Sequence, residues 1–140
     1  MTIERLDRVF LDANILYSAA YGSDAGLKRL WNLKKAVLLT SDYAIAEARR
    51  NLAQDRPPAL DRLEHLVADL VTTSPMQNVR LPSDIRLDEK DRPILLAAID
   101  CKADYLLTGD ARHFGHLYGR RVASVLILRP AQYLNRVAER

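Results

Sequence analysis

Residues 105–110 read Tyr-Leu-Leu-Thr-Gly-Asp, a short apolar run that passes through a glycine turn into a carboxylate. Residues 9–12 read Val-Phe-Leu-Asp, again an apolar run followed directly by an acid. Short apolar runs bounded by turn signals are typical of strands buried on both faces of a parallel sheet. In open parallel sheets, functional side chains gather just beyond the carboxyl ends of the strands. The two stretches therefore predict a parallel sheet with acids at one edge.

Two further acids stand beside apolar runs. Glu47 lies in the segment that follows a second predicted strand, and Asp91 stands just ahead of an apolar helical run. We expect these two acids to meet Asp12 and Asp110 in one pocket. Carboxylates that lie close together repel one another unless a cation lies between them. Because hard divalent cations such as Mg²⁺ or Mn²⁺ prefer oxygen ligands, the sequence predicts a divalent-metal site.

Strand and helix patterns alternate along the chain, which favours an α/β fold. We expect a three-layer α/β/α sandwich around a central, mainly parallel sheet of four to five strands, built as one domain over residues 1–140. The expected strands cover residues 8–11, 36–40, part of 71–81, 105–107 and 122–128. The expected helices cover residues 13–20, 24–33, 42–52, 59–70, 90–101 and a short segment from 130. Residues 111–121, with two glycines, are expected to form an irregular basic loop.

Polar residues and a proline mark the expected helix starts. Ser23 or Asp24 is expected to cap one helix, and Ser41 or Asp42 the next. Pro93 falls in the first turn of the helix at residues 90–101, where its missing N–H matters least. These signals place Asp91 at the start of a helix whose apolar side packs inward.

The charge balance leaves two interpretations open. The chain has 21 basic and 18 acidic residues, a net charge of +3. If four acids hold a metal, 21 basic against 14 acidic residues leave +7 on the remaining surface. A basic surface around an acidic pocket suits a polyanionic substrate, although a solvated arginine-rich surface has the same composition.

Cysteine content and hydropathy predict a cytoplasmic protein. A single cysteine, Cys101, excludes an intramolecular disulfide and suits a reducing compartment. No apolar stretch approaches the length of a membrane span, and residues 1–5 lack the design of a signal peptide.

Each acid taken alone also has a structural explanation. Asp12 could cap a helix, Glu47 could be a solvated helical residue, and Asp110 could serve a turn. A first-turn acid such as Asp91 suits the helix dipole. Asp88, three residues earlier, competes with Asp91 for a ligand role; we favour Asp91 because it leads the apolar helix.

Other catalytic chemistries lack their residues. His65, His113 and His116 show no zinc-ligand spacing with the single cysteine. There is no glycine-rich phosphate loop and no nucleophile elbow. Residues 12–14, Asp-Ala-Asn, resemble the Asp-x-Asp motif of aspartyl-phosphate phosphatases, but an amide replaces the second acid. A small phosphatase is therefore a weak alternative.

With these acids in view, the chain resembles PIN-domain proteins, and in particular the bacterial VapC-like ribonuclease toxins. The similarity is collinear and covers nearly the whole chain. The stretches that carry it are residues 9–16, 40–49, 91–98, 103–110 and 128–134.

The resemblance implies a Mg²⁺- or Mn²⁺-dependent endoribonuclease. It implies that the metal is held by Asp12, Glu47, Asp91 and Asp110, and that RNA is hydrolysed to a 5′-phosphate and a 3′-hydroxyl. Polar family positions, whose side chains would orient the acids or waters, are occupied by Asn14, Ser41 and Thr108. Capping and turn bonding explain these three residues as well, Ser41 above all.

The same resemblance suggests contacts with RNA and with other proteins. Arg49, Arg112 and His113 are the expected RNA contacts, and simple solvation is their alternative. Many family members carry an acid or amide where this chain has Arg112. A toxin would have an antitoxin partner that covers the acidic pocket, with an arginine inserted among the acids. The amphipathic helix at residues 59–70 could supply a homodimer contact, although core packing explains its apolar stripe equally well.

Two further functions fit the same residues. A housekeeping RNA-processing nuclease would share the acids, since the toxin assignment depends on the resemblance alone. A non-catalytic PIN-like domain that binds RNA or protein would keep the fold without binding the metal.

Overall fold

The computed structural model describes residues 5–22, 24–74 and 79–140. Within them, the strands are β1 (Asp7–Leu11), β2 (Ala36–Ser41), β3 (Val71–Thr73), β4 (Tyr105–Leu107), β5 (Arg121–Val122) and β6 (Val125–Leu128). The α-helices are α1 (Ala13–Tyr21), α2 (Asp42–Asp55), α3 (Leu60–Ala68), α4 (Arg92–Asp100), α5 (Ala111–Phe114) and α6 (Pro130–Ala138). Three 3₁₀ helices complete the list of helical segments: η1 (Ala25–Asn32), η2 (Pro57–Ala59) and η3 (Gly115–Leu117).

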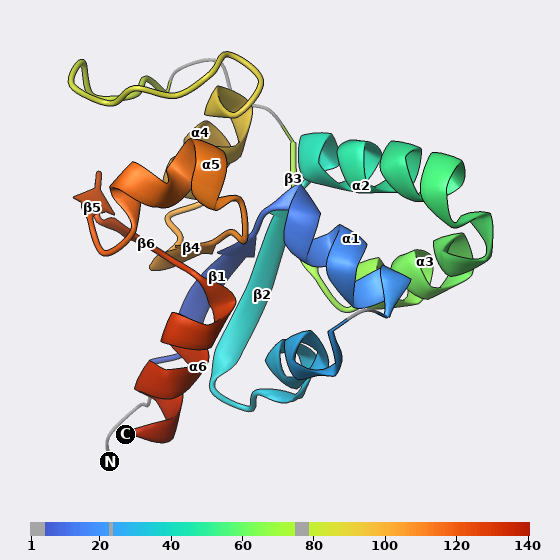
Figure 1. Ribbon diagram of the computed structural model, residues 1–140. Coiled ribbons are helices and arrows are strands. Elements are labelled where there is room, and N and C mark those ends of the chain that lie inside the picture. Colours follow the sequence, from blue (N-terminus) through green and yellow to red (C-terminus); the bar gives the residue numbers. More distant parts are fainter. Residues whose placement is uncertain (1–4, 23, 75–78) are drawn as a thin grey trace.

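The six strands form one sheet in the order β3-β2-β1-β4-β6-β5, and every pairing is parallel except that of β5 with β6. Helices α1, α2 and α3 lie to one side of the sheet, whereas α4 and α5 lie to the other (Figure 1). The expected α/β class with a central, mainly parallel sheet is therefore confirmed.

The order of the strands reverses between β1 and β4. From β1 the chain adds β2 and β3 in one direction, then returns to place β4 and β6 on the other side of β1. Such a reversal opens a crevice at the carboxyl ends of the two central strands. The backbone N–H of Asp12, directly after β1, donates to the carbonyl of Leu107 at the end of β4 with an N···O distance of 3.1 Å. The two strand ends are thereby held together at the point where the crevice opens.

The sheet has one strand more than the upper expected number because residues 121–128 form a hairpin. A single strand over 122–128 was expected, and that prediction is wrong. Ala123 and Ser124 have φ values of 48° and 74°, and two successive residues with positive φ reverse the chain between β5 and β6. Neither residue is a glycine or an asparagine, so the usual turn signal is missing from the sequence.

Residues 111–121 are also more regular than expected. In place of an irregular loop they contain α5, η3 and the first residue of β5. Phe114 and Leu117 are fully buried, so apolar residues at helical spacing hold these two turns on the core. Along residues 24–33, the predicted helix is a 3₁₀ helix, η1.

The caps agree with the polar signals in the sequence. Asp24 accepts from the N–H of Gly26 at 2.9 Å before η1, while Ser23 lies outside the described residues. Ser41 caps α2 by accepting from the N–H of Ala44 at 3.1 Å. Pro93 lies in the first turn of α4, as expected.

The apolar stripe of α3 belongs to the core. Leu63 is fully buried, and the remaining members of the stripe pack against the core while partly exposed: Leu60, Leu66, Val67 and Leu70. Core packing therefore accounts for the stripe, and a homodimer contact through this helix stays a prediction. No helix in the described part of the chain has the length and apolar character needed to cross a lipid bilayer.

The central strands should dominate stability. Leu106 in β4 is fully buried, whereas Leu6 is 43% exposed. We expect Leu106→Ala to lower the free energy of unfolding by about 2–5 kcal/mol, because it removes buried methyl groups and leaves a cavity. Leu6→Ala makes the same chemical change at the surface and should cost less than about 1 kcal/mol. Urea denaturation of both variants would measure this, and equal losses would contradict the described core.

Candidate metal centre

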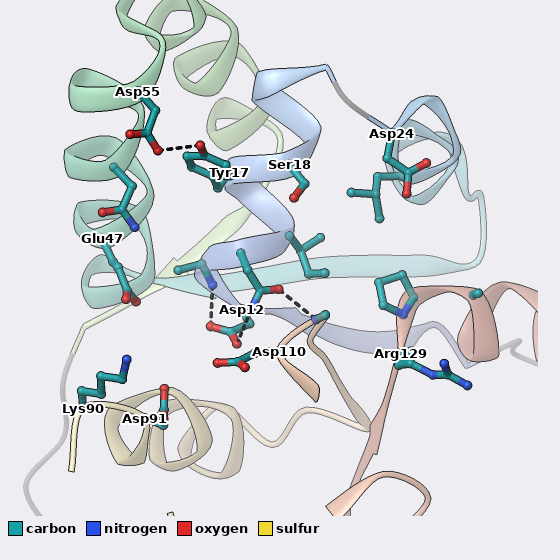
Figure 2. Close-up of a pocket in the computed structure, with 18 residues that line it drawn as sticks. Asp12, Tyr17, Ser18, Asp24, Glu47, Asp55, Lys90, Asp91, Asp110 and Arg129 are labelled. Atoms are coloured by element: carbon teal, nitrogen blue, oxygen red, sulfur yellow. Dashed lines mark hydrogen bonds between the residues drawn. The ribbon is translucent and has the colours of Figure 1, made fainter. Parts of the chain in front are cut away.

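A pocket of about 760 Å³ lies at the carboxyl ends of β1 and β4, where the strand order reverses. All four acids expected to meet there line it: Asp12, Glu47, Asp91 and Asp110. They come from the end of β1, from α2, from the start of α4 and from the turn after β4, and Figure 2 shows them around one space. The structure therefore brings together side chains that are up to 98 positions apart in the sequence.

Asp12 is the most buried of the four acids, with 5% of its surface exposed. As the cap of α1, its Oδ1 accepts from the N–H of Ala13 at 2.6 Å. Its Oδ2 accepts from the Thr108 hydroxyl at 2.8 Å and from the Asn14 amide at 3.0 Å. Burial raises the pKa of Asp12 to about 6; the hydrogen bonds from Thr108 and Ala13 oppose that rise, and the charge of Glu47 adds to it. The side chain is thus fixed in place while its ionised form is destabilised, and a bound cation would offset that cost.

The Thr108 hydroxyl uses its complete hydrogen-bonding capacity. It donates to Asp12, and it accepts from the Asn14 side-chain amide at 3.2 Å and from the N–H of Asp110 at 3.1 Å. Asn14 in turn accepts from the N–H of Gly109 at 2.9 Å through its Oδ1. The turn after β4 is therefore joined to the first turn of α1, and this fixes the position of Asp110 relative to Asp12.

His113 lies among three aspartates. Its Nδ1 is 2.6 Å from Asp110 Oδ2 and 3.5 Å from Asp91 Oδ2, and its Nε2 is 3.3 Å from Asp88 Oδ2. Asp110 also caps α5 by accepting from the backbone N–H of His113 at 3.2 Å. In the structure its ring holds the carboxylate of Asp110, and the RNA contact expected of His113 stays a prediction. The spacing of three residues on a helix was the available signal.

Asp91 has a buried oxygen without a hydrogen bond. It precedes α4, but its side chain makes no capping hydrogen bond, so the helix start does not explain this acid. Among the described residues, Asp91 Oδ2 is buried and has no hydrogen-bond partner, since the 3.5 Å separation from His113 Nδ1 is too long to count as one. Burial raises the pKa of Asp91, an effect that the charge of His113 opposes. A buried carboxylate oxygen without a donor fits a position beside a cation.

Asp91 belongs to two possible ligand groups. With Asp88 and His113 it forms a group in the described structure whose potential ligand atoms all lie within 4.8 Å of one another. With the other three pocket acids it forms the expected quartet, which lies around a wider space. Asp88 does not line that space and its side chain is 64% exposed, whereas the Asp91 side chain is 13% exposed. Both groups are dominated by carboxylate oxygens, so the donor chemistry fits Mg²⁺ or Mn²⁺.

Glu47 reaches the pocket from the second turn of α2. Figure 2 shows its side chain directed into the space bounded by Asp12 and Asp91. The charge of Glu47 contributes to the raised pKa of Asp12, which is consistent with their proximity. Its role as a metal ligand stays a prediction.

The remaining expected residues lie in different surroundings. Ser41 is buried, caps α2 and does not line the pocket, so capping explains it. The exposed Arg49 pairs with Glu64 of α3 through an Nη2–Oε1 distance of 2.8 Å. Arg112 is exposed on α5, next to Asp110 in the chain, and lines a neighbouring pocket. A role for these two arginines in RNA binding stays a prediction.

The pocket also contains residues that the sequence analysis missed. Tyr17 on α1 donates to Asp55 on α2 at 2.7 Å, and both line the pocket. Asp24, Lys90 and Arg129 line it as well (Figure 2). Helical spacing was the available signal for two of them, since Tyr17 lies one turn beyond Asn14 and Asp55 about two turns beyond Glu47.

These features define an α/β domain with an acidic centre at the switch point of a mainly parallel sheet. The family model for the PIN domain matches residues 8–112, which include all four pocket acids. The chain belongs to the PIN-domain family.

Three of the solved structures that resemble the fold contain VapC-type proteins. VapBC2 from Rickettsia felis, bound to a DNA fragment from its promoter, has a TM-score of 0.67 and 14% identity; the match covers 87% of this chain and 98% of that one. Mycobacterium tuberculosis VapC20, a toxin that cleaves the sarcin-ricin loop, has a TM-score of 0.57 and 16% identity, covering 73% and 91%. VapBC-1 from nontypeable Haemophilus influenzae has a TM-score of 0.58 and 15% identity, covering 87% and 97%. At such identities the likeness shows the fold. No curated protein sequence matches the chain.

The raised pKa of Asp12 predicts a pH-dependent stability of the metal-free protein. Because the folded state binds this proton more tightly than the unfolded chain, whose pKa is near 3.8, Asp12 should lower the free energy of unfolding as pH rises from about 4 to 6. Asp12→Asn removes the buried charge, so at pH 7 we expect the variant to be more stable than the unmodified protein by about 1–3 kcal/mol.

Urea denaturation in EDTA at pH 4.5, 5.5 and 7 would measure this difference. The control is Asp69→Asn, at the exposed C-terminal end of α3, which should show no such trend. A stability difference between Asp12→Asn and the unmodified protein that stays constant over this pH range would contradict the prediction.

Proposed function

We propose that this chain is a Mg²⁺- or Mn²⁺-dependent endoribonuclease, the toxin of a toxin–antitoxin pair, which acts on RNA in the cytoplasm. The observation that carries the proposal is the buried Asp91 oxygen without a donor, in a pocket that also holds the destabilised carboxylate of Asp12. Several acids gathered in this way are explained by a cation that compensates their charge. Membership of the PIN-domain family and the likeness to VapC structures support the nuclease and toxin assignments.

The four pocket acids, Asp12, Glu47, Asp91 and Asp110, would hold the metal. When bound, the cation would supply Lewis-acid stabilisation of a phosphodiester and activation of a water molecule. Thr108 and Asn14 would keep the Asp12 carboxylate in one orientation through the hydrogen bonds described above.

Cations at the rim of the pocket would draw in the substrate. His113 would hold Asp110 in place from the side of α5. Lys90 and Arg129 line the pocket from opposite sides in Figure 2, where they would attract the phosphate groups of a polyanion. The positive charges of Lys90 and Arg129 would offset part of the repulsion between RNA and the acidic pocket.

An antitoxin would close this site. The chain's proposed partner is a protein segment that lies across the acidic pocket and inserts an arginine among the carboxylates. Two of the similar structures are VapBC complexes, and this favours such a partner for the present chain.

Metal binding should be measurable without RNA. Calorimetric titration of the purified protein with Mn²⁺ should show saturable binding. Thermal unfolding should show a stabilisation of about 2.7 kcal/mol when the Mn²⁺ concentration is 100 times the dissociation constant. Asp91→Asn should abolish both the binding and the stabilisation, because Asp91 belongs to both possible ligand groups.

Two further variants separate the ligand groups. If the pocket quartet holds the metal, Glu47→Gln should weaken Mn²⁺ binding and Asp88→Asn should not. The reverse result would place the metal on Asp88, Asp91 and His113. Absence of Mn²⁺ and Mg²⁺ binding by the folded protein would contradict the proposed enzyme and favour a non-catalytic PIN-like domain.

Cleavage should depend on the metal and on Asp12. Incubation of total RNA with the protein and Mn²⁺ should give discrete cuts that disappear in EDTA. Substitutions beside a metal ligand typically lower activity by roughly 10–100-fold, and we expect Asp12→Asn to lower the cleavage rate by more than that. Asp69→Asn, the same change outside the pocket, should retain activity. Intact RNA, or equal cutting by Asp12→Asn, would contradict the proposal.

A further inference from the structure

A second pocket, of about 490 Å³, adjoins the acidic one on the side of α4 and α5. Its walls come from residues 83–88 of the connector before α4, from the first turn of α4, and from α5 and η3, elements that lie on one side of the sheet in Figure 1. Asp88 and His113 line this second pocket, and His113 is also bonded to Asp110 of the acidic pocket. The two pockets are therefore adjacent and share a boundary at His113.

Arginines give the second pocket its charge. Arg86, Arg92 and Arg112 line it, and all three are exposed. Within the described part of the chain none of them forms an ion pair, and the one side-chain hydrogen bond among them runs from Arg92 Nε to the carbonyl of Leu87 at 3.2 Å. Asp88 is the single carboxylate in the lining, so the cationic charge exceeds the acidic charge.

Some of the arginines outside this pocket have acidic partners. Arg49 pairs with Glu64, Arg120 with Asp84 and Arg140 with Asp7. The arginines of the second pocket differ from these because their guanidinium groups remain available to an external anion. Guanidinium binds phosphate through paired hydrogen bonds, which makes an arginine-lined pocket suited to phosphate groups.

The end of the acidic pocket away from these arginines is lined by further acids. Asp55 lines it beside Tyr17, and Asp24 lines it on the other side of α1, before η1 (Figure 2). A strand whose scissile phosphate lies near Asp12 would meet further negative charge in that direction, and arginines in the direction of α5. Of these two directions, electrostatics favours the one toward the arginines for the backbone of a bound polyanion.

We propose that the pocket lined by Arg86, Arg92 and Arg112 binds the phosphates of the RNA strand that flank the scissile phosphate. The proposal rests on the proposed nuclease function and extends it by giving the direction in which the substrate leaves the acidic pocket. These arginines position the backbone and do not read the base sequence. An acidic peptide of a protein partner would fit the same charges, but the shared boundary with the acidic pocket favours the continuous phosphate chain of RNA.

Binding can be separated from cleavage in the full-length chain. In an Asp12→Asn background, the affinity for a single-stranded RNA oligonucleotide would be measured between 50 and 300 mM salt, alone and with Arg86→Gln plus Arg112→Gln. Each phosphate contact on a single strand contributes about 0.7 to the slope of log affinity against log salt. We expect the double change to lower affinity by about tenfold or more at low salt, and to reduce the slope by about 1.4.

Arg29→Gln is the matched control. Arg29 is an exposed arginine of η1 that lines neither pocket, and its change should leave affinity and salt slope within error of the background protein. Equal RNA affinity and equal slope for the double variant and for Arg29→Gln would overturn the proposal. Loss of binding to poly-glutamate by the double variant, with RNA binding unchanged, would assign the pocket to an acidic protein instead.

The direction of the strand can be tested by neutral linkages. Methylphosphonates on the side of the scissile phosphate that Arg112 contacts leave the arginine no phosphate charge to bind. They should therefore remove the effect of Arg112→Gln on RNA affinity, whereas methylphosphonates on the other side should leave that effect unchanged. An equal effect of Arg112→Gln with every oligonucleotide would overturn the contact. This result can be told apart from a failure of the proposed nuclease function. If the nuclease function is wrong, the unmodified protein will show no metal-dependent cleavage, regardless of how the arginine variants bind RNA.

Discussion

The hydrogen bond from the Thr108 hydroxyl to the Asp12 carboxylate joins the ends of β1 and β4, and the geometry of the acidic pocket depends on it. The Thr108 hydroxyl donates one hydrogen bond, to Asp12, and accepts two, from the Asn14 side chain and from the backbone N–H of Asp110. A buried carboxylate needs such donors, because it loses the water that would otherwise stabilise its charge. The same contact also fixes the turn that carries Asp110, so the local requirements of one buried acid determine where a second acid lies.

The charges inside the acidic pocket differ from those on the surface around it. Inside the pocket, Asp12 and Asp91 both have raised pKa values, chiefly through burial, and this leaves them poised for a cation. Outside it, the arginines near α5 have no acidic partner among the described residues, whereas Asp24 and Asp55 extend the negative charge away from them. Net charge alone, at +3, conceals both features because the opposite charges cancel in the sum. This separation of charge in space would suit the proposed cleavage of a polyanion at a metal.

The elements predicted with success are those with strong, uninterrupted patterns. β1 and β4 consist of residues that lie between two helical layers, so their apolar runs reflect burial on both faces. The predictions over 111–121 and 122–128 were wrong for a common reason: tertiary packing overrides the local signals there. Phe114 and Leu117 are fully buried and hold helical turns despite nearby glycines, and Ala123 with Ser124 turns the chain at positive φ without a glycine. Burial of a few apolar side chains outweighs turn propensity in segments this short.

By itself the sequence predicted the class of fold, the mainly parallel sheet and the four acids that line one pocket, because apolar runs and the polar residues that flank them are local patterns. Only the tertiary structure decided how these acids are held. The bonds from Thr108 to Asp12 and from His113 to Asp110, the donor-free oxygen of Asp91, and the arginine-lined pocket all arise where strand order reverses. Contacts between residues far apart in the chain depend on that topology, and a pattern read along a single chain contains no distance between them.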